Sequence, residues 1–261
     1  MDFGISQKVA LVTGAAGGLG SAIANALAAE GACVIVADIN DEAAEQVASA
    51  IRQQGGYARA LQWDLGDVAG IPARLNALAP EWAQVDILVN NTGGPPPTLA
   101  QGVDTADWQI YFNSMVTGVI KLTDAVLPGM RSRRWGRIIT STSSGVVAPI
   151  PNLGISNTLR SALVGWSKTL SREVAADGVT ANIILPGRIA TQRIQQLDQA
   201  RATREGRDIA DVVQASVQSI PAGRYGRPEE YGKTVAFLAS EAASYITGSV
   251  IRVDGGLIPS I

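Results

Sequence analysis

The chain has 261 residues, 46% hydrophobic side chains and a formal net charge of −2, which suit one folded α/β domain and exclude a disordered chain. Because charges of both signs nearly balance, the composition gives no basic surface that would favour nucleic acid or an anionic membrane as a partner. The chain contains no histidine, which excludes a histidine-ligated metal site and a histidine general base. It contains one cysteine, Cys33, which excludes an internal disulfide.

Short apolar runs alternate with longer amphipathic stretches along the chain. The apolar runs predict seven buried strands, at 8–12, 33–37, 58–63, 86–90, 137–142, 180–185 and 249–253. The amphipathic stretches predict helices at 21–30, 41–54, a stretch ending near 79, 107–130, 153–176 and 228–240. This alternation predicts a Rossmann-type, doubly wound parallel sheet of about seven strands, with right-handed crossovers, in a single domain over 1–261.

Residues 188–222 are the exception to this alternation. They are polar and interrupt the alternation of strands and helices, so we interpret them as an insertion over the site and a candidate lid. The chain shows no signal-peptide pattern and no apolar run of about 18 residues, so we expect a cytoplasmic protein without a membrane span.

A glycine-rich turn, Thr13-Gly-Ala-Ala-Gly-Gly-Leu-Gly20, joins the first predicted strand to the first predicted helix. Gly14, Gly18 and Gly20 permit a sharp turn and the close approach of a pyrophosphate to the free N–H groups at the helix N-terminus. We therefore predict a dinucleotide site here, with Gly17 and Leu19 as further members. The alternative is a plain glycine-rich turn, which the strand before it, the helix after it and the acid after the next strand disfavour.

That acid is Asp38, at the end of the second predicted strand, followed by Ile39. A carboxylate at this position can accept both ribose hydroxyls of an adenosine and would repel a 2′-phosphate. Since the glycine turn also contains no arginine or lysine, we predict that the cofactor is NAD and not NADP. The alternative role for Asp38 is to cap the next helix, although Asn40 or Asp41 could cap that helix unaided.

Further motifs make the chain similar, over nearly its whole length, to the short-chain dehydrogenases/reductases, and above all to β-ketoacyl-acyl-carrier-protein-reductase-like members. These motifs are Asp64-Leu65, Asp86-Ile-Leu-Val-Asn-Asn-Thr-Gly93, Pro186-Gly187, Gly226-Arg-Pro-Glu-Glu230, Tyr245-Ile-Thr-Gly248 and Asp254-Gly-Gly256. The cofactor-binding residues that the resemblance implies are Asp64, Leu65, Asn91, Gly93, Pro186, Gly187, Ile189 and Thr191. The first two are expected against the adenine, and the last four against the nicotinamide carboxamide.

The resemblance also implies a catalytic tetrad of asparagine, serine, tyrosine and lysine. Asn113 matches the asparagine, which supports a proton-relay water, although a surface or kink-forming helix residue is the alternative. Ser143 matches the serine, which hydrogen-bonds the substrate oxygen. Its register is open by one position because Thr142 and Ser144 stand beside it, and a hydroxyl that only satisfies a turn remains the alternative.

At the tyrosine and lysine positions this chain departs from the family pattern, because it has Ser156 and Arg160 there. Serine is a far weaker acid than a phenol and is shorter, whereas arginine keeps a cation that can hold the nicotinamide ribose but essentially cannot deprotonate. We therefore count Ser156 and Arg160 as catalytic candidates, and Arg160 as a cofactor-binding candidate too. The stiff loop Gly93-Gly-Pro-Pro-Pro97 is a second departure.

The sequence thus predicts an NAD(H)-dependent oxidoreductase that interconverts a small carbonyl and an alcohol with a non-standard proton donor. A water held by Ser156, Ser143 or Asn113, or an acid from 188–222, would replace the phenol. The alternatives are a catalytically weak NAD-binding protein in regulation or assembly, and an enzyme that uses its cofactor for non-redox chemistry. We also expect a homotetramer, with a dimer as the fallback, because family members commonly assemble through the helices predicted at 107–130 and 153–176.

Overall fold

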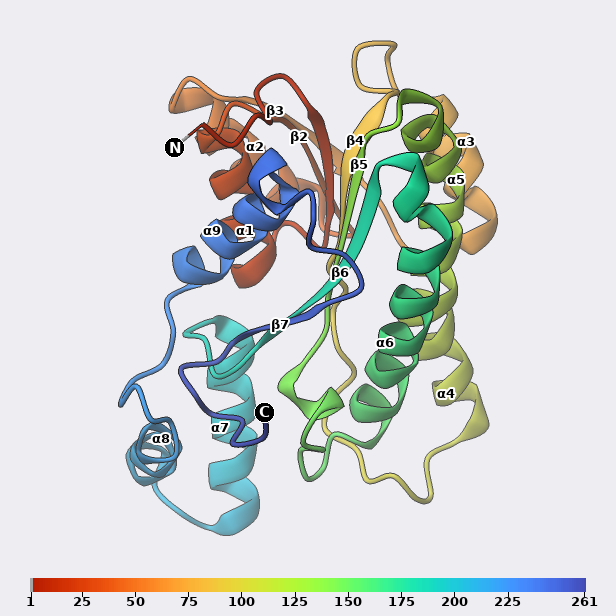
Figure 1. Ribbon diagram of the computed structural model, residues 1–261. Coiled ribbons are helices and arrows are strands. Elements are labelled where there is room, and N and C mark those ends of the chain that lie inside the picture. Colours follow the sequence, from red (N-terminus) through yellow and green to blue (C-terminus); the bar gives the residue numbers. More distant parts are fainter. Residues whose placement is uncertain (1) are drawn as a thin grey trace.

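The computed structural model describes residues 2–261 and confirms the predicted fold class (Figure 1). All strands of the sheet are parallel, in the spatial order β3-β2-β1-β4-β5-β6-β7. Their bounds are β1 Val9–Thr13, β2 Cys33–Asp38, β3 Tyr57–Gln62, β4 Val85–Asn90, β5 Gly136–Ser141, β6 Val179–Pro186 and β7 Val250–Val253. Strands β1, β4 and β5 are buried throughout, and in β4 and β5 this burial includes the charged side chains Asp86 and Arg137.

Helices cover both faces of this sheet (Figure 1). One face carries α1 (Gly18–Ala29), α2 (Asp41–Gln53) and α9 (Pro228–Ala239). The other carries α3 (Ile71–Asn76), α5 (Gly118–Arg133) and α6 (Gly154–Val174). Helices α1 and α9 pack closely, because a Cβ on Gly232 would lie 2.3 Å from the carbonyl oxygen of Ala22. No helix between residues 2 and 261 is both long and apolar enough to cross a membrane.

The strand order reverses between β1 and β4, which are neighbours in space but not in sequence. In an open parallel sheet, the chain leaves such neighbouring strands in opposite directions and opens a crevice at their carboxyl ends. The glycine turn follows β1 at this point, and the loop with Gly93 follows β4. The fold therefore brings the two predicted cofactor-binding segments together.

Two stretches differ from the predicted elements. The helix expected at 107–130 is α4 (Thr105–Phe112), a π-helical turn (Asn113–Thr117) and α5, so the backbone changes its hydrogen-bond pattern where the tetrad asparagine was expected. The segment 188–222 contains two helices that the sequence did not predict, α7 (Gln192–Glu205) and α8 (Ile209–Gln218). Helix α7 escaped prediction because its buried positions are only Asp198 and Ala202, so it lacks an apolar stripe.

Candidate active site

A cavity of about 1050 Å³ opens at the carboxyl ends of the central strands, between the glycine turn and α7. Every residue that the sequence proposes for cofactor binding lines it. These are Gly14, Gly17, Gly18, Leu19, Gly20, Asp38, Ile39, Asp64, Leu65, Asn91, Gly93, Arg160, Pro186, Gly187, Ile189 and Thr191. Ser143 and Ser156 line the same cavity, so the two halves of the predicted site form one continuous space.

The glycine turn has no room for a side chain at Gly14 or Gly20. Gly14 adopts φ +55°, and a Cβ there would lie 2.4 Å from the carbonyl oxygen of Asn91. A Cβ on Gly20 would lie 2.0 Å from the carbonyl oxygen of Gly14. Helix α1 begins behind this turn without a side-chain cap, so its first N–H groups remain free for an anion.

Asp38 lines the cavity beside the glycine turn, and its carboxylate is fixed by two backbone N–H groups. Its Oδ2 accepts a hydrogen bond from the backbone N–H of Ala16 at 3.0 Å, and its Oδ1 accepts one from the N–H of Asn40 at 3.1 Å. The side chain of Asn40, and not that of Asp38, caps α2 by accepting from the N–H of Ala43. The carboxylate of Asp38 therefore lies at the cavity, tied to the glycine turn.

Buried polar atoms without partners support the fit of a nicotinamide dinucleotide to this cavity. Across residues 2–261, Trp63 Nε1, Thr92 Oγ1 and Thr142 Oγ1 are buried without a hydrogen-bond partner, and all three residues line the cavity. Such groups are costly unless a ligand or water satisfies them. Together with the free N–H groups of α1 and the carboxylate of Asp38, they match the polar and charged groups of a dinucleotide.

Ser143 and Ser156 face the cavity from two different elements. Ser143 follows β5, and its Oγ accepts a hydrogen bond from the N–H of Gly145 at 3.1 Å, which fixes the start of a short 3₁₀ turn. Ser156 lies in the first turn of α6 with 6% of its surface exposed. Its hydroxyl makes no hydrogen bond to any other residue from 2 to 261, so it is free to bind a ligand or a water.

Arg160 lies one helical turn beyond Ser156 and is almost fully buried. Its Nη1 donates to the carbonyl oxygen of Ser141 at 3.2 Å, and its Nη2 donates to the carbonyl oxygens of Thr92 and Gly93 at 3.0 and 3.2 Å. Burial lowers the pKa of Arg160 to about 10, so the guanidinium stays charged at neutral pH. Arg160 thus joins the loop after β4 to the end of β5, in addition to lining the cavity.

The structure does not bring Asn113 to the cavity. Its side-chain oxygen accepts a hydrogen bond from Gln109 Nε2 at 2.9 Å on the exposed side of the helix, in the π-helical turn. The neighbours Tyr111 and Ser114 line the cavity instead. The side chain that the resemblance implied for a relay water therefore points elsewhere.

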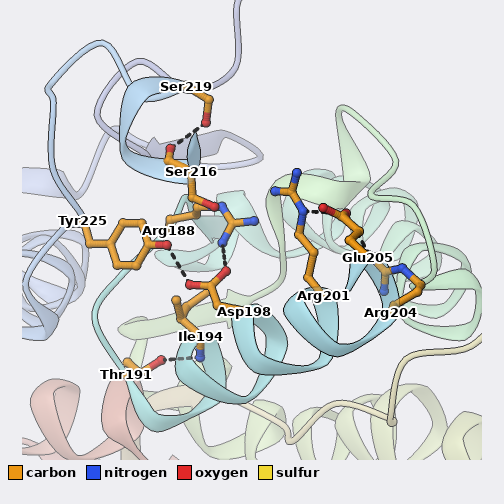
Figure 2. A network of polar contacts seen from close by, with 10 residues as sticks. All are labelled: Arg188, Thr191, Ile194, Asp198, Arg201, Arg204, Glu205, Ser216, Ser219 and Tyr225. Carbon is orange, nitrogen blue, oxygen red and sulfur yellow. Dashed lines mark hydrogen bonds and ion pairs between the residues drawn. The ribbon is translucent and has the colours of Figure 1, made fainter. Parts of the chain in front are cut away.

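The segment 188–222 forms one wall of the cavity through α7 and is anchored by Asp198 (Figure 2). Asp198 is 1% exposed, and it accepts from Arg188 Nη1 at 2.6 Å and from the hydroxyl of Tyr225 at 2.6 Å. Burial, followed by the hydrogen bond with Asp198, raises the pKa of the Tyr225 hydroxyl. This buried cluster joins the chain before α7 to the chain after α8.

Tyr111 and Arg193 are among the cavity residues that the sequence-based reasoning missed. Arg193 follows Thr191 by two residues, and its Nη2 donates to the carbonyl oxygen of Pro95 at 2.6 Å. Burial lowers the pKa of Arg193. Its position two residues after the family motif was the only available signal, and nothing in the sequence shows that it meets the proline loop.

The comparisons with known proteins agree with this geometry. Residues 14–258 match the family model described as enoyl-(acyl carrier protein) reductase. The chain is 37% identical to the 3-oxoacyl-[acyl-carrier-protein] reductase FabG of Escherichia coli (strain K12) over 252 residues, which cover 96% of this chain and 97% of the relative.

Two solved structures are also similar over almost the whole chain. The L-sorbose reductase of Gluconobacter frateurii, complexed with NADPH and L-sorbose, has a TM-score of 0.93 at 32% identity and full coverage of both chains. A 7α-hydroxysteroid dehydrogenase, complexed with NADH and 7-oxo glycochenodeoxycholic acid, has a TM-score of 0.89 at 29% identity, covering 98% of this chain and 96% of that one. The similar structures thus include complexes with NADPH, which carries a 2′-phosphate, and with NADH, which does not.

Proposed function

We propose that this chain, which belongs to the short-chain dehydrogenase/reductase family of NAD(P)-dependent oxidoreductases, interconverts a small carbonyl compound and its alcohol with NAD(H) and a non-standard proton donor. The bound nicotinamide would supply a hydride to the carbonyl carbon or accept one from the alcohol carbon. The protein must then deliver one proton to the carbonyl oxygen, or remove it from the alcohol.

The single observation that carries this proposal is the continuity of the cavity from the glycine turn to Ser143 and Ser156. A dinucleotide bound along Gly14–Gly20 and Asp38 would end with its nicotinamide near both hydroxyls. Ser143 would hydrogen-bond the substrate oxygen. Arg160 would keep the loop after β4 in place and lend a positive charge beside the nicotinamide ribose.

The proton donor is proposed to be a water held by Ser156, because this hydroxyl is free and the phenol of the family pattern is absent at its position. Stopped-flow measurement of NADH oxidation with a panel of ketones and aldehydes tests the function. Turnover with any of these carbonyls supports it. A protein that shows a higher melting temperature with NADH but no turnover would instead be the NAD-binding regulator considered from the sequence.

We expect NADH to bind at least about tenfold more tightly than NADPH, a difference of about 1.4 kcal/mol. The reason is that the carboxylate of Asp38, fixed by the N–H of Ala16, would meet a 2′-phosphate with like charge. A fluorescence titration of both cofactors measures this ratio. Asp38→Asn is expected to reduce the ratio of NADH affinity to NADPH affinity, because it weakens NADH binding and removes the repulsion between the carboxylate and the 2′-phosphate of NADPH.

The matched control is Asp41→Asn, which removes the same charge three residues away in the first turn of α2, outside the cavity lining. It is expected to leave the ratio of the two affinities unchanged. Equal affinities in the wild-type protein would show that Asp38 does not face the ribose.

We also propose that the protein is a homotetramer. Helix α4 presents two large apolar side chains to solvent in the single chain, Ile110 at 59% and Phe112 at 41% exposure, and such side chains favour burial against another copy. Light scattering at micromolar concentration is expected to give four times the protomer mass of 27.1 kDa. Ile110→Asp with Phe112→Asp should yield smaller species, whereas a strictly monomeric wild type would contradict the proposal.

A further inference from the structure

The charged side chains of the cavity are distributed unevenly. Two carboxylates line it, Asp38 at the end of β2 and Asp64 just after β3, where the adenosine is expected to bind. Helix α7 contributes Arg193, Arg201 and Arg204 to the lining. Arg201 and Arg204 follow Arg193 by 8 and 11 residues and lie on the same side of the helix. The three arginines therefore form a positive stripe that extends about 12 to 16 Å along α7.

The carboxylates on this side do not balance the arginines. Arg188 is neutralised by Asp198 at 2.6 Å. Arg201 and Arg204 share the single carboxylate of Glu205, at 2.8 and 3.6 Å (Figure 2). Arg207, outside the cavity, takes the same carboxylate at 3.2 Å. The outer part of the wall therefore keeps a net positive charge.

The inner arginines lack any counter-charge. Within residues 2–261, neither Arg160 nor Arg193 forms an ion pair with a carboxylate, and both donate only to backbone carbonyls. Both guanidinium groups converge on Gly94, since a Cβ built there would lie 3.4 Å from Arg193 Nη2 and 3.7 Å from Arg160 Nη2. Two partly desolvated like charges this close are unfavourable unless an anion joins them.

We propose that the substrate carries a carboxylate near its reacting carbonyl, and that Arg193, aided by the charge of Arg160, binds this carboxylate. This inference rests on the proposed function for the reaction and adds the class of substrate, an oxo acid or hydroxy acid. The pyrophosphate of the cofactor is the other anion available. The stripe favours the substrate, because Arg201 and Arg204 continue it along α7 away from Thr191, which lies against Gly18 of the glycine turn.

Binding without turnover tests the proposal directly. The probes are 2-oxopentanoate, 3-oxobutanoate and 4-oxopentanoate, each with its methyl ester, which keeps the carbonyl and removes the charge. They are titrated calorimetrically into the protein saturated with NAD⁺, where no hydride can be delivered. We expect at least one acid to bind about 10- to 100-fold more tightly than its ester, as a charge-assisted hydrogen bond implies.

Arg193→Gln is expected to abolish this preference, and Arg193→Lys to keep part of it because the charge remains. The matched control is Arg207→Gln, which makes the same charge change in the same segment at a side chain outside the cavity. It should keep the full preference. Melting temperatures measured on all variants show that they remain folded.

Three results separate the possibilities. If no acid binds more tightly than its ester, or if Arg193→Gln keeps the preference, the proposal is overturned. If Arg193→Gln weakens NADH binding about tenfold while the acid-to-ester ratio stays the same, the arginine holds the pyrophosphate and the proposal is again overturned. If the preference depends on Arg193 but no acid is reduced by NADH, the carboxylate site stands and the proposed redox function fails.

Discussion

A protein carrying both Ser156→Tyr and Arg160→Lys is expected to reduce small aryl and acyl ketones with NADH about 10²-fold faster than the wild type, or more. The double change restores a phenol at the cavity and an ammonium one helical turn away, and a positioned general acid contributes about 10²–10⁴-fold in rate. Neither single change should suffice. In Ser156→Tyr alone, the Arg160 guanidinium is still charged but is held by the carbonyl oxygens of Ser141, Thr92 and Gly93, so it does not replace the lysine ammonium of the family pattern, and the phenol pKa is expected to stay near about 10. In Arg160→Lys alone, the ammonium has no phenol to activate.

Arg160→Lys is expected to lower the stability of the protein, and this loss of stability must be separated from any change in the catalytic rate. The guanidinium joins the carbonyl oxygens of Ser141, Thr92 and Gly93, and a single amine cannot span the three in the same way. We expect a loss of roughly 1–3 kcal/mol in the free energy of unfolding for both variants with lysine.

Stopped-flow NADH oxidation on the wild type, both single variants and the double variant, below the lowest melting temperature, gives the comparison. More-than-additive gain in the double variant supports the assignment of positions 156 and 160. A wild type that turns over briskly, with a slower double variant, would show that the chain has its own efficient proton donor.

Gly20→Ala is expected to abolish NADH binding and to destabilise the protein by about 3 kcal/mol or more, which corresponds to a fall of roughly 6–12 °C in melting temperature. The added Cβ would lie 2.0 Å from the carbonyl oxygen of Gly14 and 2.7 Å from the Cα of Ala15. Both are backbone atoms that cannot rotate away. The turn would have to open, and α1 would lose its position at the cavity.

Gly17→Ala is the matched control, with the same added methyl group three residues earlier. The nearest atom to its Cβ is the carbonyl oxygen of Gly14 at 3.9 Å, an ordinary contact. Thermal unfolding is expected to stay within about 2 °C of the wild type, while NADH binding weakens because the methyl group stands at the N-terminus of α1. Equal melting temperatures for the two variants would contradict this account of the turn.

The sheet could be predicted from the sequence because strands that are buried on both faces are short, mostly apolar runs of residues. The run predicted at 8–12 is β1, Val9–Thr13, and the run predicted at 86–90 is β4, Val85–Asn90, each within one residue at both ends. The π-helical turn could not be predicted, because its hydrogen-bond pattern depends on packing. Helix α7 was not predicted because it also depends on tertiary packing. Its main buried side chain is Asp198, a charged residue that is held by Arg188 and Tyr225 from outside the helix.

The cofactor-binding half of the cavity could be predicted because its signals lie in short stretches of the sequence. Glycine conformation at Gly14 and an acid at the end of β2 are both visible in short windows of sequence, and the strand order then brings them together. Arg193 has no such local signal, because its importance arises from meeting the loop at Pro95. Asn113 shows the opposite case, since a residue of the right type in nearly the right place points away from the cavity.

The packing of α1 against α9 has a consequence for the protein during translation. The apolar side chains of α1, Ile23 and Leu27 among them, share a core cluster with Tyr231 and Val235 of α9. A ribosome-bound chain that ends before α9 therefore holds the glycine turn on a helix that lacks part of the apolar packing it has in the complete fold. We therefore expect the first half of the chain to be a poor cofactor-binding module by itself, and the nascent protein to hold its dinucleotide firmly only after α9 has been synthesised.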